Sequence, residues 1–126
     1  MIIIGHPWIK SKPFCKVFSI EDIKASHQDH VVLLEPLADS HTHAQYCSNN
    51  SIEFAVVVST LEDALFANGL GAMYLVCEEA DALLIEPIAT EYMFDAQILV
   101  LITNQKEVSR IARGHIDGVI FVEAIV

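Results

Sequence analysis

The sequence of 126 residues predicts one α/β domain spanning residues 1–126, with an open, mainly parallel sheet of about five or six strands and helices on both faces. Three observations predict this flavodoxin-like or half-barrel arrangement. Short β-branched runs alternate with helix-start signals along the chain. The run of residues 54–58 is apolar at every position, which is typical of parallel strands covered on both sides. The length suits a single core, and 53% of the residues are hydrophobic.

The first half of the chain follows this alternation weakly. Residues 1–4 are isoleucine-rich and predict an additional strand, whereas residues 5–13 predict no regular structure. Residues 16–18 predict a short strand that leads to Ser19 as the N-cap of a helix. The next predicted strand, residues 31–34, leads through Pro36 into a helix around residues 39–48.

The middle of the chain gives the clearest strand–helix signal. Residues 54–58 predict a buried strand, and Ser59 and Thr60 each stand three residues before an acid, in capping-box spacing. The helix that follows should end near Gly69. Residues 73–77 predict the next strand, followed by an acid-rich helix start. Pro87 should kink or divide that helix, because proline lacks the backbone N–H group.

The last strand–helix unit closes the predicted sheet. Residues 97–102 predict a buried strand, after which Asn104 and Glu107 have capping-box spacing. The helix should end at Gly114, with two arginines in its last turn, and residues 119–122 predict the final strand.

Charge is distributed unevenly along the chain. Residues 25–105 contain no Lys or Arg but twelve Asp and Glu, and all seven basic residues lie towards the two ends. Nucleic acids and anionic membranes require a basic surface, so we expect neither as a partner. Three widely spaced cysteines, no long apolar run and no signal-peptide pattern predict a cytoplasmic protein with free thiols.

The C-terminal half resembles the βα units of phosphate-binding (βα)8 barrels. The resemblance rests on residues 61–76, on the helix of residues 103–114 and on the strand that begins Asp117-Gly118. It implies a final strand followed by a Gly-Ser pair whose amides hold phosphate. Val122 and Glu123 stand where that pair would be, so we expect the packing of these barrels without their phosphate site. Since a complete barrel takes about 250 residues, we expect a half-barrel or an open sheet.

Two other motifs indicate chemistry but are incomplete. A receiver domain would need an acidic pair after the first strand and a lysine near the last, and this chain has neither, so no phosphoacceptor is expected. Residues 39–43 read Asp-Ser-His-Thr-His, which resembles the start of the metal site of amidohydrolase-like barrels. His41 and His43 are weak candidate ligands, because residues two apart on a helix face different directions.

The carboxyl ends of the strands are the expected ligand-binding edge of such a sheet. The side chains predicted at this edge are His6, Glu35, Ser59, Thr60, Cys77, Glu78, Thr103, Asn104 and Glu123. Converging carboxylates there would suit a divalent cation such as Mg²⁺ or a general acid or base. Otherwise no cofactor is expected.

Two function classes follow from this pattern. The first is a non-catalytic module that forms homo-oligomers or binds a small molecule, since no motif is complete. The alternative is a small enzyme that uses carboxylates at the strand ends, and this requires Glu35, Glu78 and Glu123 to lie together. Trp8, the only tryptophan, is expected to pack against the edge of the sheet, and the alternatives are a lid or an oligomer contact.

Overall fold

A computed structural model describes all residues from 1 to 126. It has seven strands: β1 (Ile2–Ile4), β2 (Phe14–Lys16), β3 (Val31–Leu34), β4 (Phe54–Val57), β5 (Tyr74–Cys77), β6 (Gln97–Ile102) and β7 (Gly118–Phe121). Its helices are α1 (Ile20–Ala25), α2 (Leu37–Asn49), α3 (Leu61–Gly69), α4 (Glu79–Glu91) and α5 (Val108–Arg113), with short 3₁₀ turns η1 (Gln105–Glu107) and η2 (Val122–Ala124). The prediction of a single α/β domain is confirmed, with seven strands rather than five or six.

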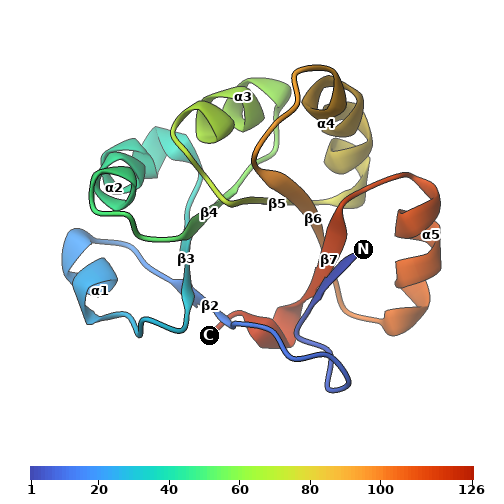
Figure 1. The fold of residues 1–126 in the computed structure, drawn as a ribbon, viewed down its shortest axis with the longest axis horizontal. Helices are drawn as coiled ribbons and strands as arrows, with labels where there is room; N and C mark the ends of the chain where they lie inside the picture. The colour runs from blue at the N-terminus through green and yellow to red at the C-terminus, as the bar shows by residue number, and fades with distance from the viewer.

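All seven strands are parallel, in the order β1-β7-β6-β5-β4-β3-β2. The sheet curls into a ring, and its two ends meet through the last residues of the chain (Figure 1). The Val126 N–H group donates to the Phe14 carbonyl at 2.8 Å, and the Lys16 N–H group donates to the Val126 carbonyl at 3.1 Å. The half-barrel expectation therefore describes the sheet better than the flavodoxin-like one.

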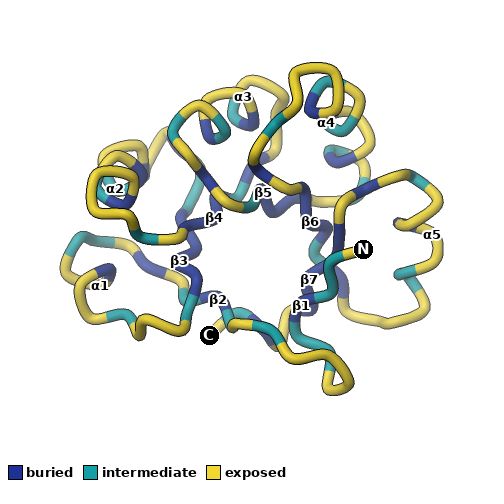
Figure 2. Tube along the Cα trace, in the orientation of Figure 1, coloured by how far each residue is buried: buried dark blue, intermediate teal, exposed yellow.

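The five helices lie outside the ring of strands (Figure 1). The prediction of helices on both faces is therefore wrong. Strands such as β3 and β7 are nevertheless buried at every residue (Figure 2), because the side chains on the concave face form a core of their own. In β3, for example, Val31 and Leu33 point into an inner core of nine buried residues, while Val32 and Leu34 belong to an outer core of 26 beneath the helices.

Helix caps follow the sequence closely. The Ser19 hydroxyl accepts the Asp22 N–H group at 3.1 Å, and the Thr60 hydroxyl accepts the Asp63 N–H group at 3.1 Å. Thr60, rather than Ser59, is thus the N-cap of α3. Pro87 was expected to kink or divide its helix, and division is wrong, since α4 runs through this residue as one helix. No helix in the structure is both long and apolar enough to cross a membrane.

Candidate functional site: two cavities at the carboxyl ends of the strands

The carboxyl ends of the strands carry two separate cavities. The larger, which we call the mouth cavity, has a volume of about 720 Å³ and lies over the ends of β2, β3, β4, β5 and β6. The smaller, of about 510 Å³, lies beside the ends of β1, β6 and β7, and we call it the side cavity. The two share no lining residue.

The predicted edge residues divide between these cavities. Glu35, Ser59, Cys77 and Glu78 line the mouth cavity. His6, Thr103, Asn104 and Glu123 line the side cavity. Thr60 lines neither, because its hydroxyl caps α3.

The floor and walls of the mouth cavity are apolar. They are formed by inward-facing side chains of the strands, by the residue after β4 and by the C-terminal segment that joins the two ends of the sheet: Leu33, Val57, Val58, Val76, Leu101, Val122, Ile125 and Val126. A largely apolar hollow of this volume is typical of pockets that bind small organic molecules.

Four charged side chains surround this apolar floor. Glu35 follows β3, Glu78 and Asp81 stand at the start of α4, and Lys16 ends β2. None of these four side chains forms an ion pair or a hydrogen bond within the protein. Three carboxylates against one ammonium group give this opening an excess of negative charge. Lys16 and Asp81 were not among the predicted edge residues, although Lys16 lay in a predicted strand and Asp81 in a predicted first helical turn.

Cys77 is buried at the end of β5, in the wall of the mouth cavity. Burial, reinforced by the nearby Asp81 and Glu78 carboxylates, raises the pKa of this thiol to about 12. Cys47, on the buried face of α2, has its pKa raised to about 11 by burial. Both thiols are therefore protonated and poorly nucleophilic at neutral pH. Cys77 contributes packing to the cavity wall rather than a reactive group.

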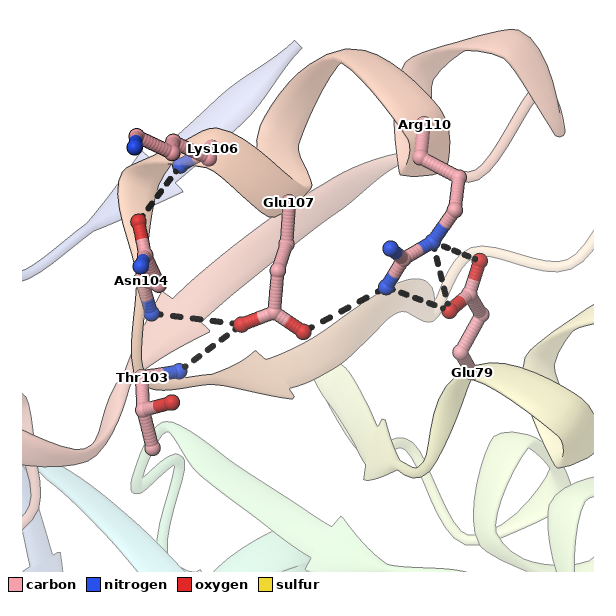
Figure 3. A network of polar contacts seen from close by, with 6 residues as sticks. All are labelled: Glu79, Thr103, Asn104, Lys106, Glu107 and Arg110. Atoms are coloured by element: carbon pink, nitrogen blue, oxygen red, sulfur yellow. Dashed lines mark hydrogen bonds and ion pairs between the residues drawn. The ribbon is translucent and has the colours of Figure 1, made fainter.

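A polar network fixes the strand–helix turn that borders the side cavity (Figure 3). The Glu107 carboxylate accepts the N–H groups of Thr103 and Asn104, at 3.3 and 3.2 Å, and completes the predicted capping box. Arg110 links Glu107 to Glu79 on α4, with nitrogen–oxygen distances of 3.3 and 3.0 Å. The backbone of Thr103 and Asn104 is therefore held in place, while the Thr103 hydroxyl remains available to a ligand.

The candidate metal ligands do not assemble into a site. His41 and His43 lie on α2, where the His41 ring contacts the Leu37 carbonyl at 3.2 Å and His43 is half-buried. No three His, Cys, Asp or Glu side chains of the chain lie close enough together to hold a metal ion. Glu123 faces the side cavity, so Glu35, Glu78 and Glu123 do not converge.

The segment after β7 differs from a phosphate cradle. Val122 and Glu123 begin the 3₁₀ turn η2, and their side chains line different cavities. Asp117, which precedes β7, has a structural role, because its carboxylate accepts the Ile98 N–H group at 2.8 Å. The chain matches no protein-family model and no curated protein. A relationship to phosphate-binding (βα)8 barrels therefore remains a resemblance in packing.

Proposed function

We propose that this chain is a non-catalytic module that binds a small, largely apolar molecule carrying an amine. The mouth cavity carries the proposal, because its apolar floor is surrounded by three carboxylates without partners. Its volume of about 720 Å³ lies within the range of about 300–1,000 Å³ that is typical of small-molecule sites. Burial of the ligand's apolar part would supply most of the affinity.

The charges around the opening favour a cationic group on the ligand. Glu35, Glu78 and Asp81 outnumber the single ammonium group of Lys16. An anionic ligand would meet net repulsion at the opening, whereas an amine could pair with the carboxylates of β3 and α4. Each such pair at a partly exposed position contributes about 0.2–1 kcal/mol, so the carboxylates would contribute more to selectivity than to affinity.

The alternative, an enzyme that uses strand-end carboxylates, has less support. It requires Glu35, Glu78 and Glu123 at one place, but Glu123 lines the side cavity. The buried Cys77, whose pKa is raised, offers no activated nucleophile in the mouth cavity. Binding therefore explains this cavity with fewer assumptions than catalysis does.

A thermal-shift comparison of three matched compounds tests the proposal. 2-Phenylethylamine should raise the melting temperature in a saturable manner, and at about 100 times its Kd it should stabilise the fold by about 2.7 kcal/mol. The neutral 2-phenylethanol should stabilise it less, and 3-phenylpropionate should have the smallest effect. In the double variant Glu78→Gln/Asp81→Asn, the Kd for the amine should rise by up to about 25-fold, since the loss of each ion pair raises the Kd by up to about fivefold.

A matched control separates cavity charge from overall charge. The variant Glu62→Gln/Asp63→Asn removes two carboxylates from the first turn of α3, which does not line the mouth cavity. It should leave the Kd for 2-phenylethylamine within about twofold of the wild-type value, because exposed charges outside the cavity are screened by salt. Equal stabilisation by all three compounds, or equal losses in both double variants, would argue against an amine site.

Self-association of the chain is a second proposal, based on exposed apolar side chains. Phe66 on α3 and Leu84 on α4 are 69% and 72% exposed, and these two helices are neighbours. Apolar surface of this kind often marks an interface. Light scattering at high concentration should give at least the mass of a dimer, and Phe66→Asp should shift the distribution towards the monomer. A strictly monomeric wild-type protein would contradict this expectation.

Other expectations from the sequence stay predictions. They are a cytoplasmic location, the lack of nucleic-acid and membrane partners, and the absence of a cofactor other than a divalent cation. The same thermal-shift assay with Mg²⁺ tests whether a divalent cation binds.

A further inference from the structure

Trp8 is the most exposed large apolar side chain of the molecule, at 84%. The expectation that it packs against the sheet is therefore wrong. The residue lies in the loop between β1 and β2 and lines the side cavity. Its indole is the only one in the chain. An exposed aromatic ring that lines a cavity offers an apolar face against which a ligand can pack.

The loop around Trp8 is held by specific contacts. The backbone N–H group of Trp8 donates to His6 Nδ1 at 3.2 Å, and the two rings meet edge to face at a centroid distance of 4.7 Å. Since Nδ1 accepts, neutral His6 carries its proton on Nε2, which lies 2.9 Å from Gln105 Oε1. The Gly5 N–H group donates to the Ser11 hydroxyl at 3.0 Å. The indole is therefore presented to solvent by a fixed backbone.

Polar groups with unused hydrogen-bonding capacity line the same cavity. The Thr103 hydroxyl, the side-chain NH₂ groups of Asn104 and Gln105, and the Glu123 carboxylate make no hydrogen bond within the protein. These four groups offer both donors and acceptors. No Lys or Arg side chain lines the cavity. The lining therefore disfavours an anion and suits a neutral ligand rich in hydroxyl groups.

We propose that the side cavity binds a saccharide, with one face of a sugar ring stacked on Trp8. A pyranose ring has an apolar face of C–H groups and a periphery of hydroxyls, each able to donate and accept. Trp8 provides a matching apolar surface, and Glu123 and Asn104 can bond adjacent hydroxyls. A cationic ligand fits less well, because only one carboxylate faces the cavity and the three neutral polar groups would have no partner.

The single tryptophan makes intrinsic fluorescence a direct test. Titration with glucose, galactose, mannose, N-acetylglucosamine and their β-linked trimers should give a saturable change in Trp8 emission for at least one compound. Calorimetry with that compound should show at least tenfold weaker binding for Trp8→Ala and for Glu123→Ala. Tyr92→Ala, which removes another exposed aromatic side chain outside the cavity, should bind like the wild type.

The saccharide proposal and the amine proposal for the mouth cavity are tested independently. Binding of 2-phenylethylamine should be unchanged in Trp8→Ala, so either proposal can fail without the other. The saccharide proposal is overturned if none of these sugars gives a saturable change. It is also overturned if choline chloride gives a saturable change in Trp8 emission and the sugars do not. The same holds if Trp8→Ala and Glu123→Ala bind the sugar as tightly as Tyr92→Ala does.

Discussion

Substitution of Gly118 by alanine is expected to destabilise the fold by about 3 kcal/mol. Gly118 begins β7 and lies between β1 and β6, opposite Ile2 on one side and Leu99 on the other. A Cβ atom here would stand 2.6 Å from the Ile2 Cβ atom and 2.9 Å from Leu99 Cδ2. Alanine normally stabilises a chain by about 0.4–1 kcal/mol through the unfolded state, but displacement of a paired strand costs more than that gain.

Chemical denaturation followed by circular dichroism measures this loss. Gly69→Ala is the matched control, because Gly69 ends α3 and a Cβ atom there meets no atom within 4 Å. It should be neutral or stabilising by up to about 1 kcal/mol. Equal free energies of unfolding for the two variants would show that β1 does not pack against β7 in the manner described.

The close packing at Gly118 also explains why this chain has the Asp117-Gly118 pair at the start of its last strand, as phosphate-binding (βα)8 barrels do. The glycine allows close approach of two strands, and Asp117 accepts the Ile98 N–H group at the start of β6. Both residues serve the assembly of parallel strands, which this chain shares with such barrels. Their presence therefore carries no information about phosphate, in agreement with Val122 and Glu123 at the next turn.

The strands and caps could be predicted because their causes are local. Alternation of β-branched runs with cap residues identified six strands to within one residue at each end and placed Ser19 and Asn104 at helix starts. The short β2 was displaced by two residues, since Phe14–Lys16 is held by pairing with β3 and with the C-terminal segment rather than by its own pattern. Tertiary pairing of this kind leaves little signal in a three-residue run.

The curl of the sheet could not be predicted, because apolar strands have the same sequence pattern whether a helix or the opposite side of a ring covers them. Helices were expected on both faces of the sheet, whereas Val31 and Leu33 face an inner core that no helix covers. For the same reason the site was only partly predicted. The edge residues were placed at the carboxyl ends of the strands, but their division into two cavities depends on the C-terminal segment from Val122 to Val126.

Replacement of Phe14 by alanine should cost about 3–5 kcal/mol of folding free energy, because it removes a large side chain from the inner core. The Phe14 side chain is completely buried, and its ring centroid lies 5.5 Å from that of Tyr74. Its carbonyl also accepts the Val126 N–H group where the two ends of the sheet meet. The cavity left by alanine would be enclosed by strands that cannot collapse without opening the ring, which places the expected cost towards the upper part of this range.

The control for Phe14 is the same substitution at an exposed position. Phe18→Ala should cost less than about 1 kcal/mol, because this side chain is 63% exposed. Phe14→Leu should give an intermediate value of about 1–2 kcal/mol, since it restores most of the apolar volume. Urea unfolding at one protein concentration compares the three variants while holding any contribution from self-association constant. If Phe14→Ala cost no more than Phe18→Ala, the interior of the ring would not be a packed core, and the apolar floor of the mouth cavity would lose its support.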